Sequence, residues 1–374
     1  MSGRSLALLL AAALLLVAGQ AAAEPTFLSK DYPRCTSCHF SPTGGGLLND
    51  FGRTMSHTVL PTFPAASGAD ATAPDGEQAF LYGALGDALG DARLGVALRP
   101  SHLRFGFPGG SADRNLLMQA DLQAAYRRGA LTLYADIGRH PEGDGGELGS
   151  YEHWVSYQAA SGLTVRAGRF LPAYGVKLAD HTSFNRRTLG FGESDQVYGV
   201  EVSRSAGSTL VQVAVAPGRA DAIIDDDGTR AFAATGRVQV DVAPRTVVVA
   251  SGAYRASSDL GAASGSGGLA LGLAPLSRLA LWTQVDALGV DGAGTSVVVV
   301  HEASFEAYRG VWLKLSPQFR TGNDAGASDT GRLVFGATLL PRTHWNVNLT
   351  YARDHNYDFD VSTDTLMAQL HLFL

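Results

Sequence analysis

The sequence predicts an all-β protein: a transmembrane antiparallel β-barrel of about 16 strands, preceded by a short N-terminal segment that is mainly helix and loop. One reason is composition, because 45 of the 374 residues are glycine, 12 are tyrosine and only 17% are charged, as in chains full of tight turns. A second reason is the period-two alternation of apolar and polar residues over 92–374. The third is a regular alternation of short and long connections along that region.

Residues 1–23 have the pattern of a secretory signal peptide. Arg4 precedes an apolar stretch from Leu6 to Val17, and the alanines at 21–23 form a small-residue cleavage site. No stretch of the chain reaches the ~20 continuous apolar residues of a membrane-spanning helix. The net charge of −6 is spread along the chain, which gives no reason to expect nucleic acid as a partner. We therefore expect an exported protein.

Residues 24–60 contain both cysteines of the chain, within the sequence CTSCH at 35–39. C-x-x-C-H is the attachment signature of c-type haem, because two cysteines on one helical turn can reach the two vinyl groups of the porphyrin. The histidine that follows then presents its imidazole to the iron. We therefore expect one covalent haem c, bound through Cys35 and Cys38, with His39 as an axial ligand.

Three other interpretations of the cysteine pair have less support. A thioredoxin-like redox pair calls for a βαβ context, which the surrounding residues lack. A zinc site needs further ligands, and only His39 and His57 are near. A simple disulfide of an exported protein stays open.

The second axial ligand is open between two residues. Met55 and His57 both follow His39 across a stretch that the glycines at 44–46 can turn back over the haem plane. Residues two apart on a helix point ~200° apart, so only one of them can face the iron. We expect His57, with Met55 as the alternative. Imidazole would give a lower reduction potential than thioether.

The longer string over residues 35–53 resembles a short monohaem module of exported proteins from metal-reducing and related bacteria. The matching positions are His39, Pro42, Gly44 to Gly46, Leu48, Asn49, Phe51, Gly52 and Arg53. This resemblance implies redox work at the cell envelope.

Residues 61–91 are rich in Ala, Gly, Pro and Asp and are expected to form a linker or plug, with a plug helix or an extra edge strand over 76–95.

The barrel is expected to occupy 92–374, where the stretches between connections alternate. In WNVNLTYAR at 345–353, the odd-numbered residues from 345 to 351 are apolar or aromatic, and the even-numbered ones from 346 to 350 are polar. The expected short turns are 127–129, 160–162, 205–208, 243–245, 274–277, 308–310 and 340–343. The expected long loops are 107–115, 138–150, 171–194, 217–229, 257–264, 291–295, 321–330 and 354–362. A β-sandwich in water also alternates, but it does not order short and long connections so strictly.

This region resembles bacterial general porins, and it makes up roughly three quarters of the chain. The resemblance implies an outer-membrane location with the short turns in the periplasm, and 16 to 18 strands leave a water channel. The segment DTLMAQLHLFL at 364–374 would close the barrel against the first strand. Such barrels usually end in an aromatic residue, whereas this chain ends in Leu374 with Phe373 on the opposite face.

The longest loop, Leu171 to Ser194, resembles the third loop of general porins, which folds into the barrel and narrows it. The candidate constriction residues are Arg166, Arg169, Lys177, Asp180, His181, Arg186 and Arg187. A mostly positive cluster in a low-dielectric neck would favour small anions. The alternative is a solvated outer loop whose charges pair with one another. No catalytic residue is expected.

Together these features indicate a monohaem cytochrome segment at the periplasmic side, or in the lumen, of an outer-membrane barrel. The first hypothesis is electron transfer at or across the outer membrane, an arrangement that resembles porin-cytochrome conduits. Because one haem does not span ~30 Å of hydrocarbon, periplasmic or extracellular cytochromes would be partners. The second hypothesis is a diffusion porin for small solutes, anionic ones included, with a regulatory haem. The third is a redox enzyme with an open haem iron. The oligomeric state stays open, a trimer included.

Overall fold

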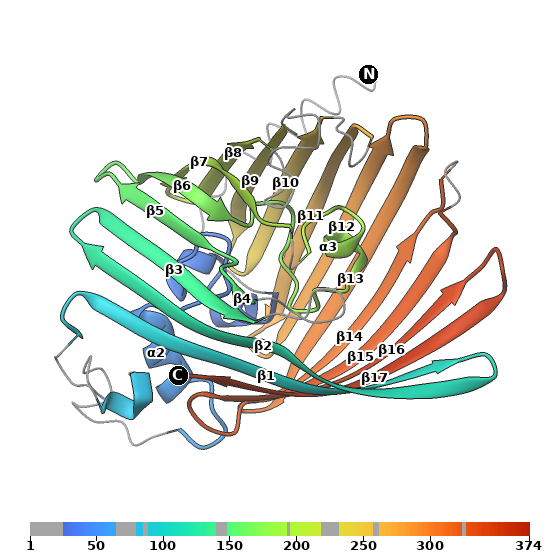
Figure 1. Cartoon of the computed structure of the whole chain (residues 1–374), viewed down its shortest axis with the longest axis horizontal. Helices are drawn as coiled ribbons and strands as arrows, with labels where there is room; N and C mark the ends of the chain where they lie inside the picture. The colour runs from blue at the N-terminus through green and yellow to red at the C-terminus, as the bar shows by residue number, and fades with distance from the viewer. Residues whose placement is uncertain are drawn as a thin grey trace.

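A closed antiparallel barrel forms the body of the molecule. The computed structural model describes residues 25–64, 80–84, 89–139, 148–192, 195–217, 232–256, 262–323 and 327–374. Each long strand pairs with the next long strand in sequence, and β17 (Val361–Phe373) pairs with β1 (Ala92–Phe107), as Figure 1 shows. The predicted closed barrel of sixteen strands is confirmed. The predicted signal peptide, residues 1–23, lies outside the described residues.

Sixteen long strands make the described part of the wall, and the two-residue strand β4 pairs with the end of β3. The remaining bounds are β2 Gly110–Arg128, β3 Leu131–Arg139, β4 Leu148–Gly149, β5 His153–Gln158, β6 Leu163–Phe170, β7 Val197–Ala206, β8 Thr209–Ala216, β9 Ala233–Ala243, β10 Thr246–Arg255, β11 Ser264–Leu276, β12 Leu279–Val290, β13 Gly294–Tyr308, β14 Val311–Arg320, β15 Thr330–Leu339 and β16 Trp345–Asn356.

Burial alternates along the strands, with the apolar side chains exposed and the polar side chains buried. In β8, Val211 and Val213 are exposed, whereas Gln212 between them is only 3% exposed. In β12, Val285 is exposed and Asp286 is buried. An exposed apolar face is the surface that hydrocarbon favours, and a polar inner face is expected where strands enclose a lumen. The predicted alternation is therefore confirmed.

The first long connection differs from the expectation. Residues 110–115 belong to β2, which pairs with β1 up to Phe107 opposite Gly110, so the expected loop over 107–115 is wrong. Only Pro108 and Gly109 form the turn, and Gly109 has a φ of 91°, which glycine adopts without strain. The hairpin continues through a polar stretch because the backbone ladder, rather than apolar alternation, holds the two strands together.

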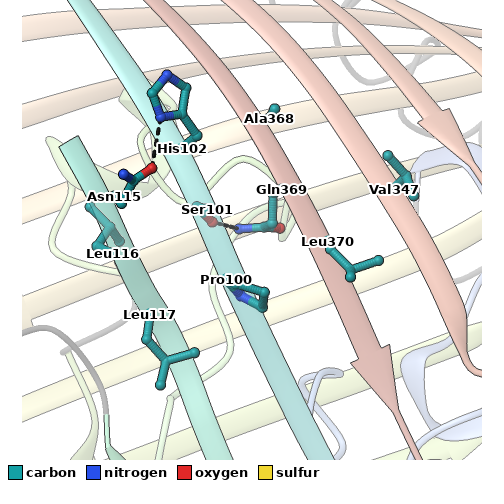
Figure 2. A pocket seen from close by; sticks show the side chains of 10 residues that line it. All are labelled: Pro100, Ser101, His102, Asn115, Leu116, Leu117, Val347, Ala368, Gln369 and Leu370. Atoms are coloured by element: carbon teal, nitrogen blue, oxygen red, sulfur yellow. Dashed lines mark hydrogen bonds between the residues drawn. The ribbon is translucent and has the colours of Figure 1, made fainter. Parts of the chain in front are cut away.

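The seam between the first and last strands contains a break in the pairing. The register of β1 with β17 passes from Leu98 opposite Leu372 to Ser101 opposite Gln369, across Pro100, which has no N–H to donate. Gln369 bridges the seam by donating to Ser101 Oγ at 3.1 Å, as Figure 2 shows. The hollow in that view is lined mainly by apolar side chains of β1, β2, β16 and β17. None of the candidate site residues lines it.

Short helices precede the barrel. They are η1 (Pro25–Lys30), η2 (Cys35–Ser37), α2 (Asp50–Thr58) and η4 (Phe80–Gly83). Across the described residues, no helix has the length and apolar character needed to cross a bilayer. The stretch expected to hold a plug helix or an extra edge strand contributes only the η4 turn and the start of β1 to the described residues.

Val213→Arg tests the lipid-facing assignment of the exposed face. Val213 lies in the middle of β8, so an arginine there would face hydrocarbon. We expect the free energy of unfolding in lipid vesicles to fall by ~2–4 kcal/mol, measured by urea denaturation. Ala206→Arg, at the short-turn end of β7, is the control and should cost under ~1 kcal/mol. Equal losses in the two variants would contradict the assignment.

Candidate functional site

Residues 25–64 occupy the short-turn end of the barrel. Arg34 of this segment pairs with the fully buried Asp241 of β9 at 3.1 Å. Asp31 pairs with Arg245, in the turn between β9 and β10, at 2.8 Å. Two ion pairs therefore tie the segment to one side of the rim.

The same segment is bound to the rest of the rim. Arg53 of α2 donates to the Leu94 carbonyl of β1 at 2.6 Å, and the Thr62 N–H donates to Leu340 O at 2.8 Å. Another ion pair joins Lys30 to Glu306 of β13. Because these partners are spread round the barrel, the segment lies across its mouth, where Figure 1 shows α2 beside β1.

The C-x-x-C-H turn is held by its own backbone. The N–H groups of Cys38 and His39 both donate to the Cys35 carbonyl, at 3.1 and 2.9 Å, which closes the 3₁₀ turn η2. Cys35 and Cys38 are not joined as a disulfide. Both sulfur atoms therefore belong to one turn, as haem attachment requires.

Asn49 joins this turn to helix α2. Its side-chain nitrogen donates to the carbonyls of Thr36 and Ser37 at 3.2 Å, and its oxygen accepts from the Gly52 N–H at 2.9 Å, capping the helix. A Cβ on Gly52 would lie 2.2 Å from the Cys38 carbonyl oxygen, so only glycine permits this packing. The motif positions Asn49 and Gly52 thus fix α2 against the cysteine turn.

The three glycines pass through a narrow space between the cysteine turn and the barrel wall. Gly44, Gly45 and Gly46 have φ values of 75°, 80° and 59°, in the left-handed region that favours glycine. A Cβ on Gly44 would lie 3.0 Å from Cys35 Sγ, and one on Gly46 would lie 2.4 Å from Tyr134 Oη of β3. Their lack of side chains therefore lets the turn fit beside the cysteine and against the wall.

His39 has a ring nitrogen available for a ligand. Its Nδ1 atom is buried and makes no hydrogen bond with the described residues. Burial, reinforced by the charge of Lys177, lowers the pKa of His39 to about 4, and the backbone of Gly46 and Gly45 acts in the opposite direction. The imidazole is therefore neutral at neutral pH, the form that binds metals. Together with the two cysteines, it fits the attachment of a c-type haem.

The two candidates for the second axial ligand lie on one helix. Met55 and His57 are both buried side chains of α2. His57 Nδ1 lies 2.9 Å from Thr343 Oγ1, in the turn before β16, and the two atoms share a hydrogen bond. Such a contact fixes the orientation of the ring, as partners of metal-bound histidines usually do. Met55 has no comparable polar group to fix it.

The loop between β6 and β7 folds into the lumen. Its apolar side chains pack with η1 and with the inner faces of β10 to β13, and Figure 1 shows α3 (Phe184–Arg187) inside the wall at that place. The buried cluster consists of Leu28, Tyr174, Val176, Leu178, Phe184, Leu189, Phe191, Val247, Val249, Ala270, Ala274, Ala280, Trp282, Val298 and Val300. The loop and the N-terminal segment therefore share one core.

Most of the candidate constriction residues bind other groups of the protein. Arg166 pairs with Glu201 at 3.0 Å, and both side chains are 1% exposed. Lys177 donates to Gly44 O at 2.8 Å. Arg169 donates to Ser150 O and Arg186 donates to Leu178 O. Asp180 accepts from Thr182 and lies 3.7 Å from Arg332. His181 is half-buried and Arg187 is exposed. These charges hold the loop and the N-terminal segment in place.

Several residues at the site were not singled out from the sequence. Tyr134, Glu201 and Arg237 face the lumen from β3, β7 and β9, and Thr343 lies in a short turn. The alternation of apolar and polar residues along the strands predicts that these three residues face inward, but it predicts the same for many other residues. Only the register of the barrel and the path of residues 25–64 show which of them meet the cysteine turn.

Comparisons with known proteins support the fold. No protein-family model matches the chain, and no curated protein matches its sequence. OprB of Pseudomonas putida superposes with a TM-score of 0.61 at 9% identity, over 76% of this chain and 94% of that one. The outer membrane channel DcaP of Acinetobacter baumannii gives 0.56 at 13% identity, over 75% and 97%. The anion-selective porin from Comamonas acidovorans gives 0.56 at 14% identity, over 76% and 99%. At these identities the likeness shows a porin-like barrel fold alone.

Gly46→Ala and Gly129→Ala form a matched pair, because both glycines have a φ of 59°. Alanine in the left-handed conformation costs ~1–2 kcal/mol at either position. A Cβ at Gly129 meets nothing within 4 Å, whereas one at Gly46 would overlap Tyr134. We expect Gly46→Ala alone to loosen residues 25–64, seen as faster proteolysis of that segment in the folded protein. Equal cleavage rates in the two variants would show that the packing of Gly46 against Tyr134 does not hold residues 25–64 in place.

Proposed function

We propose that this chain is an outer-membrane electron-transfer protein, in which a porin-like barrel holds one covalent c-type haem at its periplasmic end. The observation that carries the proposal is the position of the CTSCH turn in the short-turn mouth of the barrel. Gly44 packs against Cys35 of this turn and accepts from Lys177, and Gly46 packs against Tyr134 of β3. In bacterial outer-membrane barrels the short turns face the periplasm. That is the compartment where c-type haem is attached to exported proteins.

In this proposal Cys35 and Cys38 hold the haem covalently, and His39 binds its iron. The haem supplies reversible one-electron transfer. The backbone of Gly45 and Gly46 in the glycine turn hydrogen-bonds to the His39 ring and holds it. Next to that turn, the buried rings of Tyr134 and Trp154 stack with centroids 5.1 Å apart.

His57 is our candidate for the second axial ligand. Its ring is fixed by Thr343 through Nδ1, which leaves the other nitrogen for a metal. Helix α2 carries it, and Asn49 fixes the start of that helix to the cysteine turn. Met55, buried on the same helix, is the alternative.

Other electron carriers must work with this protein. A single haem does not cross the ~30 Å hydrocarbon layer. We therefore propose a periplasmic cytochrome as the partner on the short-turn side, with an extracellular cytochrome as the acceptor if electrons cross the membrane. A trimer is compatible with this arrangement, and one of the solved structures of similar fold, OmpT of Vibrio cholerae, is described in a trimer form.

A diffusion porin is the second candidate function. The likeness of the barrel to a channel and to an anion-selective porin favours it, and the haem would then be regulatory. The position of residues 25–64 argues against it, because this segment lies across the mouth and is bound to β1, β9 and β13. We place electron transfer first for that reason.

Covalent haem is the direct test of the proposal. Protein purified from the outer membrane of a host that attaches c-type haem should keep its haem after denaturation and give a c-type pyridine haemochrome spectrum. Replacing Cys35 and Cys38 together by alanine should remove that haem and leave a folded barrel, measured by circular dichroism. Wild-type protein that carries no covalent haem under these conditions would overturn the proposal.

Single-channel conductance separates the two candidate functions. Because residues 25–64 are bound round the mouth, we expect the full-length protein in a planar bilayer to conduct little. A variant that lacks residues 25–64 should show larger and steadier open currents, since 16 strands enclose a lumen wide enough for water. Equal open conductance of the two proteins would favour the diffusion porin.

A further inference from the structure

Positive charge gathers at the short-turn end of the barrel. The chain has a net charge of −6, yet the seven short turns predicted from the sequence and the residues directly beside them contain no Asp or Glu. Acids are concentrated in long connections instead, with three in 138–150 and four in 217–229. Six of the seven short turns have an arginine in the turn or directly beside it, at positions 127, 204, 245, 278, 309 and 342. Arginine therefore rings the mouth that residues 25–64 cover.

Most acids of the described residues at this end are held in ion pairs. They are Asp31 with Arg245, Asp50 with Arg93, Asp241 with Arg34 and Glu306 with Lys30. Asp91, just before β1, is exposed. Within the part of the chain that the structure describes, no carboxylate forms an ion pair with Arg278 or Arg309. The charges of these two arginines therefore remain for another anion.

Arg278 and Arg309 line a hollow between the barrel rim and residues 25–64. Its lining includes Lys30, Thr58 and Val59 of the segment and Arg278, Glu306 and Arg309 of the barrel. Because Lys30 and Glu306 pair with each other, the two arginines give the hollow its net positive charge. Arg309 donates to the Thr58 carbonyl. The exposed side chain of Arg278 makes no hydrogen bond with the described residues.

The hollow lies close in sequence to both parts of the proposed haem site. Lys30 precedes Cys35 by five residues, and Thr58 directly follows His57. Val59, beside the arginines, is 43% exposed and adds an apolar contact to the charged ones. Transient protein interfaces combine an apolar centre with a polar rim, and those between redox proteins are small. A protein bound at this hollow would therefore be close to the segment that carries the motif.

Membrane lipid is the other anion that a ring of arginines at this end can meet. Arg204 fits that role, because it pairs with Leu163 and Val211, two exposed residues of the outer face. Arg278 and Arg309 lie on the mouth side instead, where they line the hollow with residues 25–64. Phospholipid headgroups lie outside the wall, so a soluble protein fits these two arginines better.

We propose that Arg278 and Arg309 form the centre of a docking surface for a soluble redox protein with an acidic face. The inference rests on the proposed function, and it gives the periplasmic partner a charge and a binding site. Complementary charges raise the rate of association, and salt weakens the attraction. Such binding suits an electron carrier, which must leave after each transfer.

Succinylated cytochrome c is a suitable probe, because succinylation turns the lysines of this basic soluble carrier into carboxylates. Unmodified cytochrome c is its control. Binding is measured by surface plasmon resonance to the full-length protein in nanodiscs of phosphatidylcholine, with the linker acids at 70, 75, 77 and 87 in place. We expect the succinylated form to bind roughly tenfold more tightly at ~20 mM salt, and the difference to shrink at ~150 mM.

Arg278→Glu reverses one charge of the surface at a side chain that holds no other described group in place. We expect the association rate constant of the succinylated probe to fall roughly fivefold, because a charge at the rim acts mainly on association. Arg278→Lys keeps the charge and should keep the wild-type rate. Arg204→Glu makes the same change on the outer face of β7 and should leave the rate within about twofold of wild type.

Several outcomes would overturn the docking surface. They are equal slowing in Arg278→Glu and Arg204→Glu, which would reflect overall charge, and a probe that binds no better than unmodified cytochrome c. An unchanged rate in Arg278→Glu, with less phosphatidylglycerol co-purifying from the outer membrane, would assign the arginine to lipid. Any of these results with covalent haem present would leave the proposed function standing. Wild-type protein without covalent haem would overturn the proposed function itself, whatever the probe does.

Discussion

The pairing of β17 with β1 is the interaction on which the rest of the structure depends. Hydrocarbon offers no hydrogen bonds, so an apolar-faced sheet survives there only if its last edge is joined to its first. The pairing extends to the C-terminal residue, since Leu374 and Val96 exchange backbone hydrogen bonds at 2.9 Å. At that place a Cβ on Gly95 would lie 2.4 Å from a methyl carbon of Leu47. Gly95 therefore lies both where the last strand closes the barrel and where the N-terminal segment packs against the wall.

Closure of sixteen strands creates a lumen, and two segments of the chain lie in it. The loop after β6 supplies an apolar core against β10 to β13, and residues 25–64 cover the short-turn end. A buried charge is stable only when it is paired, which explains why Arg166 and Glu201 face each other at 1% exposure. The inner wall is thus specialised to hold segments of its own chain, and a haem on the cysteine turn would lie where these contacts converge.

The fold could be predicted largely from local patterns. Alternation within single strands identified the wall, and the count of turns and loops gave the strand number. The connection at 107–115 could not be predicted, because Gly109, Gly110 and Ser111 are typical of turns whether or not a hairpin continues past them. The cysteine turn was visible as a motif, since its chemistry lies within five residues. Its setting was not visible, because Gly46 and Tyr134 meet only through the path of the folded chain. The pairing of Arg166 with Glu201 likewise depends on the register of β6 against β7.

The central claim is that the barrel mouth holds a haem-bearing segment. An experimental structure of the full-length protein, purified from outer membranes and determined by cryo-electron microscopy, tests it most directly. The account predicts porphyrin density bonded to Cys35 and Cys38 inside the short-turn end, with His39 on the iron and residues 25–64 bound to the wall. Density for residues 25–64 outside the barrel, or for this segment in the mouth without a porphyrin, would contradict it.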